Sequence, residues 1–154
     1  MGDIKMDFSI IIPARNEEKR IKNTLVDYVG FFRNLGKSFE ILVVLNGCTD
    51  NTLGVLNEVK EKYKEVDFID IKDKIGKGVA LLEGFRLVRG DLITYTDADG
   101  STLPKTLYEL SEKIGEFDGI IGSRWMKSSI IIKKQPLSRR IASRSFNLLT
   151  RTIL

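Results

Sequence analysis

Two kinds of apolar pattern alternate along the chain. Short, largely apolar runs predict buried strands at 8–12, 40–45, 66–71, 92–96 and 119–123. Between them, apolar residues recur at three- and four-residue steps, which predicts helices at 17–35, 50–63, 79–89 and 104–114. We expect Pro13 to end the first strand, Asn16 to cap the first helix, and Gly76-Lys77-Gly78 to form a flexible loop.

This alternation of strand and helix favours one fold class. Parallel strands that are joined by right-handed crossover helices form a sheet with helices on both faces. The prediction is therefore an α/β protein with three layers, α/β/α, and a mostly parallel sheet. Ligands of such proteins bind at the carboxyl ends of the strands.

The last part of the sequence predicts a loop at 127–135 and a helix at 138–154. The apolar residues of that helix cluster on one side and its arginines line the edge, with Ile141, Phe146, Leu148, Leu149 and Ile153 against Arg140, Arg144 and Arg151. A basic amphipathic helix suits a membrane interface. The alternative is an ordinary helix that packs on the sheet or on a downstream segment.

Composition narrows the possible chemistry. The 154-residue chain has no His, which excludes His-based zinc sites, Ser-His-Asp triads and imidazole bases, so acid–base or metal chemistry falls to Asp and Glu. Its single Cys48 cannot form an internal disulfide, and no signal-peptide pattern opens the chain. No apolar run approaches the roughly 20 residues of a membrane span. We expect a cytoplasmic, reduced setting.

The net charge of +4 is unevenly distributed. After Asp118 there are eight basic residues and no acidic one, so residues 1–118 carry a net charge of −4. A basic end favours a phosphate-rich partner or an anionic membrane surface, and a solvated basic face is the alternative. Because only Trp125 and Phe146 interleave these charges, we expect no nucleic-acid partner.

Each predicted strand is followed by a polar cluster. These clusters lie at 13–17, 45–47, 74–78, 97–99 and 123–124. Residues two apart on a strand point the same way, so Asp97 and Asp99 could converge on one hard divalent cation. Alternatively, Asp-Ala-Asp-Gly forms only a polar turn after a strand. No Gly-x-Gly-x-x-Gly or Walker A pattern is present, which disfavours a dinucleotide fold or a P-loop.

Six segments carry a family resemblance in order and spacing. They are Ile12–Glu18, Val44–Thr52, Gly76–Gly78, Asp97–Gly100, Gly122–Arg124 and Leu137–Leu149. Together they resemble the motifs of family 2 glycosyltransferases with the GT-A (Rossmann-like) fold, especially the polyprenyl-phosphate (dolichyl-phosphate) mannose and glucose synthases. The likeness covers nearly the whole chain.

The resemblance implies three overlapping sets of site residues. The nucleotide-sugar pocket would be lined by Pro13, Ala14, Arg15, Glu17, Asn46, Lys77, Gly78, Asp97 and Ala98. The metal, Mg²⁺ or Mn²⁺, would be held by Asp97, Asp99 and Ser101. The catalytic set would be Asp97 and Asp99 with Arg124 and Arg139, since the two arginines match residues that meet the acceptor phosphate or the diphosphate.

Two positions depart from the family pattern. Asn46 stands where the family usually has a carboxylate at the base or ribose. Ser101 stands where mannose synthases often have Gln, and Asp-Ala-Asp-Gly is closer to the glucose-type enzymes.

The resemblance implies inverting, metal-dependent transfer of a hexose from a GDP-mannose or UDP-glucose type of donor to a polyprenyl phosphate, at the inner face of the cytoplasmic membrane. A hydroxyl acceptor would need a carboxylate base, and none follows Asp118. The alternatives are a sugar-nucleotide-binding domain without turnover and a family 2 enzyme with a hydroxyl acceptor. We expect a nucleotide-sugar-binding core at 1–124, a basic loop and amphipathic helix at 125–154, and truncation at the C-terminal end.

Overall fold

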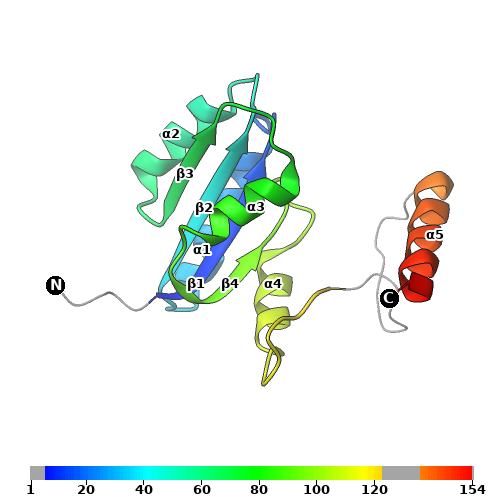
Figure 1. The fold of residues 1–154 in the computed structure, drawn as a ribbon. Helices are drawn as coiled ribbons and strands as arrows, with labels where there is room; N and C mark the ends of the chain where they lie inside the picture. Colours follow the sequence, from blue (N-terminus) through cyan, green and yellow to red (C-terminus); the bar gives the residue numbers. More distant parts are fainter. Residues whose placement is uncertain (1–5, 123–135, 154) are drawn as a thin grey trace. The chain divides into compact units, whose positions relative to one another are not determined.

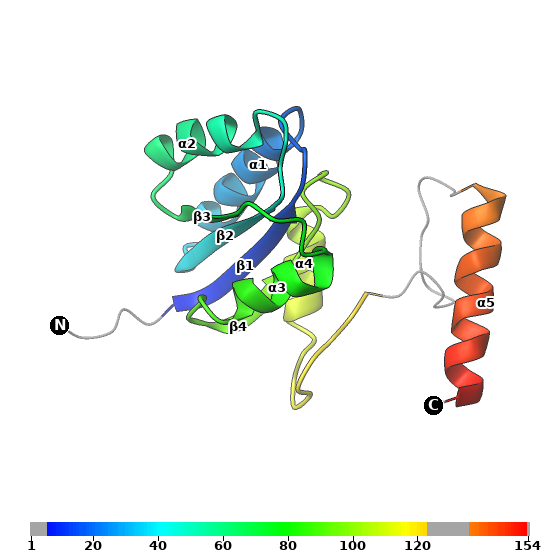
Figure 2. The same cartoon turned by 45° about the horizontal axis from the view of Figure 1, so that its top comes forward.

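The computed structural model describes residues 6–122 and 136–153 and divides the chain into two compact units, Met1–Ile120 and Ile121–Leu154. The first unit contains a four-stranded parallel sheet with helices on both faces (Figures 1 and 2). This arrangement confirms the predicted three-layer α/β architecture.

The strands of the sheet stand in the order β3-β2-β1-β4. They are β1 (Met6–Ala14), β2 (Phe39–Asn46), β3 (Val66–Ile71) and β4 (Gly90–Tyr95). The helices are α1 (Ile21–Asn34), α2 (Thr52–Lys62), α3 (Lys77–Phe85), α4 (Pro104–Ser111) and α5 (Leu137–Ile153). Because every strand runs in the same direction, all four carboxyl ends meet at one edge of the sheet.

Each face of the sheet has its own core. Helices α1, α2 and α4 cover one face, where Ile10 and Ile12 lie in the larger cluster of buried side chains. Helix α3 covers the other face, in front in Figure 1, where Ile11 packs with Val44 and Ala80. Successive residues of a strand point to opposite faces, so one run of isoleucines supplies both cores. Each such buried side chain contributes roughly 1.5–3 kcal/mol of transfer free energy.

Strand β1 does not end before Pro13, as the sequence predicted, but continues to Ala14. Its pairing with β2 includes Pro13 opposite Val44, whereas its pairing with β4 ends at Ile11 opposite Tyr95. A proline lacks only the N–H of the backbone. Beyond Ile11 there is no β4 ladder in which that N–H would be needed, so the strand tolerates the proline.

Three other predicted boundaries differ from the structure. Helix α1 begins at Ile21 instead of residue 17, and α3 begins at Lys77, which was expected in a loop. Helix α4 ends at Ser111. The predicted fifth strand is wrong for 119–122, which have no regular structure, and Ile121 is 80% exposed. A strand needs a neighbour for its backbone hydrogen bonds, and β4 pairs only with β1 in the described sheet.

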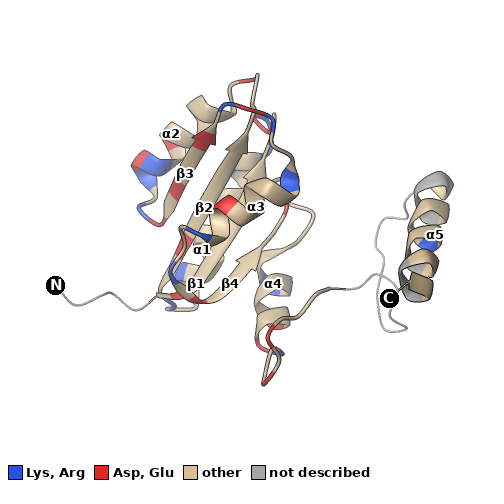
Figure 3. Ribbon diagram, in the orientation of Figure 1, with Lys and Arg blue, Asp and Glu red and all other residues tan. Residues whose placement is uncertain are grey.

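The helix predicted at 138–154 is confirmed as α5. Its apolar residues Ile141, Phe146, Leu148, Leu149 and Ile153 are each at least 57% exposed. Every charged position coloured on α5 in Figure 3 is basic. The loop predicted at 127–135 lies outside the described residues. Within 6–122 and 136–153, no helix combines the length and apolar character needed to cross a bilayer.

Candidate functional site

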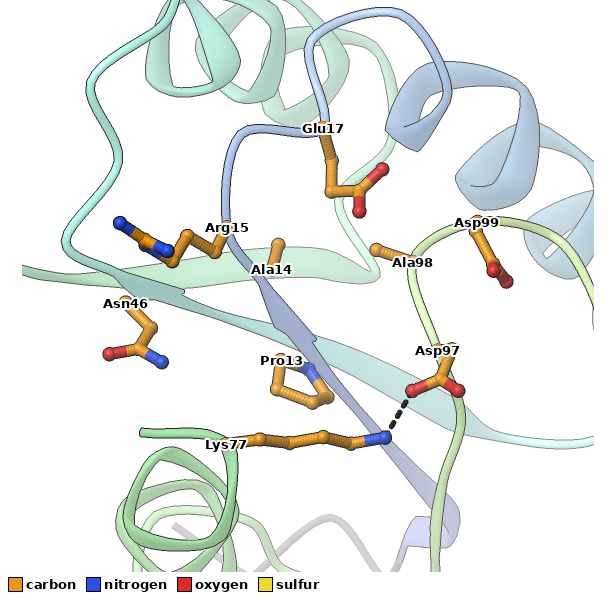
Figure 4. A pocket seen from close by; sticks show the side chains of 9 residues that line it. All are labelled: Pro13, Ala14, Arg15, Glu17, Asn46, Lys77, Asp97, Ala98 and Asp99. Atoms are coloured by element: carbon orange, nitrogen blue, oxygen red, sulfur yellow. Dashed lines mark hydrogen bonds and ion pairs between the residues drawn. The ribbon is translucent and has the colours of Figure 1, made fainter. Parts of the chain in front are cut away.

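A cavity of about 220 Å³ lies at the carboxyl edge of the sheet. It is lined by Pro13, Ala14, Arg15, Glu17, Asn46, Lys77, Asp97, Ala98 and Asp99 (Figure 4). These residues come from the ends of β1 and β2, the loop that follows β1, the first turn of α3 and the segment that follows β4. All nine were singled out from the sequence, and the parallel register of the strands brings them together.

An ion pair between Lys77 and Asp97 lies on one side of this cavity (Figure 4). Lys77 is the first residue of α3, and Gly76 before it has a φ of +86°, a conformation open to glycine, which turns the chain into the helix. Both charged side chains are about half exposed, at 52% and 51%. A pair this exposed contributes little to stability, so Lys77 can exchange Asp97 for another anion at low cost.

Asp99 is held in its charged form. Its Oδ1 accepts a hydrogen bond from the backbone N–H of Ser101 at 2.9 Å. This bond, with further help from the Ser101 hydroxyl and the positive charge of Arg20, outweighs partial burial and lowers the pKa of the Asp99 carboxyl. An ionised carboxylate is the form that binds a hard cation.

Two side chains of α1 position the segment that carries the two aspartates. Thr24 Oγ1 donates to the carbonyl oxygen of Ala98 at 3.0 Å, and the Tyr28 hydroxyl donates to the carbonyl oxygen of Thr102 at 3.0 Å. Thr24 was not singled out from the sequence, and Tyr28 was assigned only to the apolar stripe of its helix. A signal for both was present in the sequence, because their hydroxyl groups lie four residues apart on the buried face of an amphipathic helix.

The loop after β1 is bonded to the loop after β2. Asn16 has a φ of +57°, and its side chain accepts from the N–H of Thr49 at 2.8 Å and donates to the Thr49 hydroxyl at 3.1 Å. The N–H of Glu17 donates to Thr52 Oγ1 at 2.8 Å. The prediction that Asn16 caps α1 is therefore wrong, because Asn16 bonds the neighbouring loop and α1 begins five residues later.

Two carboxylates in the same pair of loops accept hydrogen bonds from their neighbours. Glu17 accepts two hydrogen bonds from Arg20, at 2.7 and 2.8 Å. Partial burial raises the pKa of Asp50, but hydrogen bonds from Thr52 and from the Glu18 backbone outweigh it and hold that pKa below its usual value. Hydrogen bonds therefore hold both carboxylates within this pair of loops.

Asn46, the last residue of β2, is 6% exposed. Its Oδ1 accepts the backbone N–H of Ile75 at 2.8 Å. In Figure 4 the amide nitrogen of Asn46 is the end turned towards the interior of the cavity, on the side of Pro13. Sequence reasoning placed Asn46 here and left the direction of its amide open.

The donor atoms fit a divalent cation that is shared with a bound phosphate group. Asp97 and Asp99 supply carboxylate oxygens from one short segment at the cavity wall. Across the described ranges, no three residues among His, Cys, Asp and Glu gather in a way that could hold a metal ion. Mg²⁺ is commonly held by one or two carboxylates, with the other positions filled by water and phosphate oxygens. Two aspartates are enough for such a site.

Two predicted site residues of the first unit, Gly78 and Ser101, are not among those that line this cavity. Gly78 lies in the first turn of α3 and is exposed, and Ser101 is exposed beside Asp99. Arg124 lies outside the described residues, and Arg139 belongs to α5 in the second unit.

Comparisons with known proteins agree on one family. The family model described as "Glycosyl transferase family 2" matches residues 9–153. The chain is 32% identical over 153 residues to "Glycosyltransferase AglD" of Haloferax volcanii, covering 97% of the chain and 24% of the relative. It is 32% identical over 122 residues to "Dolichyl-phosphate beta-glucosyltransferase" of Saccharomyces cerevisiae, covering 75% of the chain and 36% of the relative. The chain thus spans between a quarter and about a third of the length of these relatives.

A solved structure supports the same conclusion on the fold. The structure of S. aureus TarS residues 1–349 in complex with UDP-GlcNAc is similar to this chain with a TM-score of 0.57 and 26% sequence identity. The likeness covers 71% of this chain and 31% of that one. The predicted GT-A fold is confirmed.

Proposed function

The chain belongs to glycosyl transferase family 2, and from this premise we propose that it forms the donor-binding part of an inverting, metal-dependent hexosyltransferase that glycosylates a polyprenyl phosphate. The observation that carries the proposal is the cavity at the carboxyl edge of the sheet. Asp97 and Asp99 line the same cavity as Lys77 and Arg15, so side chains that can bind a cation and side chains that can bind phosphate occur in one site.

The donor in this proposal is a nucleotide sugar. Asp97 and Asp99 would hold Mg²⁺ or Mn²⁺, which neutralises the charge that develops on a departing nucleoside diphosphate. Lys77 would exchange Asp97 for a phosphate oxygen and thereby add its own positive charge to that of the cation. The named yeast relative and the Asp-Ala-Asp-Gly sequence favour a glucose-type donor over a mannose-type one.

The acceptor in this proposal is a polyprenyl phosphate. One of the relatives is named a dolichyl-phosphate glucosyltransferase. A phosphate oxygen is already anionic, so it needs only to be positioned, for which Arg124 and Arg139 are suited. Its attack on the anomeric carbon, opposite the leaving diphosphate, inverts the configuration.

The proposed place of the reaction is the cytoplasmic face of a membrane. A polyprenyl phosphate is a membrane lipid, and α5 carries exposed apolar residues together with basic ones. Such a helix can lie in the interface of an anionic bilayer.

A transfer assay tests the proposal. Purified chain is incubated with Mn²⁺, a polyprenyl phosphate in detergent, and radiolabelled UDP-glucose or GDP-mannose, and lipid-linked label is measured. We expect label from one donor, and its loss in Asp99→Asn but not in Asp27→Asn, which makes the same charge change on the exposed side of α1. Donor binding without transfer would instead identify a sugar-nucleotide-binding domain. If the chain neither binds a donor nor transfers a sugar, the proposal is contradicted.

A further inference from the structure

We infer that Asn46 is a nucleotide-binding residue whose side-chain amide donates a hydrogen bond to an acceptor atom of the bound nucleotide. The inference rests on the proposed function, because it concerns the donor nucleotide of that site. The new element is the direction of one hydrogen bond. Asn46 donates it to the nucleotide, whereas a carboxylate at the same position would accept one.

The direction of the Asn46 amide follows from its partner. A backbone N–H can only donate, so the Asn46 atom that lies 2.8 Å from the nitrogen of Ile75 is the carbonyl oxygen. The amide nitrogen is then the other end, which Figure 4 shows turned into the cavity. In the part of the chain that the structure describes, no hydrogen bond to this nitrogen is found, although Asn46 is only 6% exposed.

The surrounding backbone holds this amide in place. The N–H of Gly47 donates to the carbonyl oxygen of Ile71 at 2.9 Å. Gly47 has a φ of +62°, and a Cβ there would lie 2.9 Å from the backbone nitrogen of Lys74. The segment between β3 and α3 therefore packs directly against the end of β2. A side chain fixed between two backbone segments presents its two N–H groups in one direction.

The chemistry of the amide selects the group that it can face. With its oxygen already used, Asn46 offers only donors to the cavity. A base carbonyl or ring nitrogen, a ribose oxygen or a phosphate oxygen satisfies such a donor. An N–H of a base would leave two buried donors facing each other, which is costly. An Asp at the same position would still accept the N–H of Ile75, but it would present an acceptor and a negative charge.

Nucleotide titrations test this inference. Binding of UDP, CDP and GDP in the presence of Mn²⁺ is measured by calorimetry for the wild type, Asn46→Asp and Asn57→Asp. Asn57 is exposed on α2, so the second variant makes the same charge change away from the cavity. We expect Asn46→Asp to bind the tightest nucleotide at least about tenfold more weakly, and Asn57→Asp to stay within about twofold of the wild type.

A neutral variant separates polarity from charge. Asn46→Ser removes the two amide donors without adding a charge, and we expect it to weaken the same nucleotide about threefold to tenfold. Thermal unfolding of each variant shows whether the fold is retained, and if Asn46→Asp does not fold, the Ser variant carries the test.

Each outcome bears on the inference. If the loss of affinity in the variants differs between UDP, CDP and GDP, the acceptor atom lies on the base. If the loss of affinity is equal for all three nucleotides, the acceptor atom lies on the ribose or the phosphate. Unchanged or tighter binding by folded Asn46→Asp and Asn46→Ser would overturn the inference while leaving the proposed function in place. Failure of the wild type to bind any nucleotide would overturn both.

Discussion

The two sides of the cavity are built differently. On the side of β1 and β2, Asn16, Glu17 and Asn46 are fixed by hydrogen bonds to the neighbouring loops. On the side of α3 and β4, Lys77 and Asp97 form an ion pair in which both side chains are about half exposed. We call these the bonded side and the open side. We infer from this difference that the bonded side recognises a ligand group with side chains that are already held in place. The open side can exchange the partners of its ion pair when a charged ligand binds.

The largest expected effect comes from breaking the bonded side. Thr52 is fully buried, accepts the N–H of Glu17 and donates its hydroxyl to Asp50. Thr52→Val leaves that N–H without its partner and removes a hydrogen bond to a charged carboxylate, so we expect a loss of about 2 kcal/mol of unfolding free energy. Urea denaturation measures it, and Thr106→Val on the exposed side of α4 is the control. Equal stability of both variants would contradict the role of the bonded side.

The open side should respond in the opposite way. Lys77→Met removes one partner of an exposed ion pair, so the free energy of unfolding should stay within about 0.5 kcal/mol of the wild type. The affinity for a nucleoside diphosphate should fall about tenfold, because a charge-assisted hydrogen bond to phosphate is lost. Lys105→Met is the matched control, since Lys105 forms an exposed ion pair with Glu109 on α4. A large stability loss with unchanged affinity would reverse the comparison.

Thr24 connects the open side to the core. Its hydroxyl donates to the carbonyl oxygen of Ala98, between the two aspartates. Thr24→Val should cost about 1 kcal/mol of unfolding free energy and weaken metal-dependent nucleotide binding slightly. Thr24→Ser, which keeps the hydroxyl, should retain more of both. If Ser and Val behave alike in binding, the hydrogen bond does not position the segment.

The smallest expected effect lies outside the cavity and depends on pH. Arg33 donates two hydrogen bonds to Glu65, and these lower the pKa of the Glu65 carboxyl. A lowered pKa in the folded state stabilises the protein above the ordinary pKa of glutamate, and this contribution is lost as the pH falls through the lowered value. The difference in unfolding free energy between neutral and acidic pH should therefore be smaller in Glu65→Gln, with nucleotide binding unchanged at pH 7. An unaltered pH profile would show that the pair contributes nothing.

Much of the fold could be predicted because the strands carry a strong local signal. The apolar runs at 40–45 and 66–71 correspond to β2 and β3, and the polar residues after the strands share one edge because the strands are parallel. The apolar pair Ile120-Ile121 gave a similar signal, but it has no neighbouring strand among the described residues. Local pattern cannot show whether a strand finds a partner.

The candidate site was predictable as a set of residues but not as a set of contacts. All nine cavity-lining residues were named from the sequence. However, Asn16 bonds Thr49, which is 33 residues away, and Asn46 bonds Ile75, which is 29 residues away. Such contacts depend on how the loops meet in space. The direction of the Asn46 amide and the ion pair of Lys77 could therefore come only from the structure.

The most direct test of the central proposal is a calorimetric titration of the chain with UDP-glucose and GDP-mannose, with Mn²⁺ and again with EDTA. We predict saturable binding of one donor with Mn²⁺, at least tenfold weaker binding with EDTA, and the same loss in Asp99→Asn with Mn²⁺ present. Binding that is equally tight with and without the metal, or in Asp99→Asn, would contradict the assignment of Asp97 and Asp99 as the site of a metal-bound diphosphate.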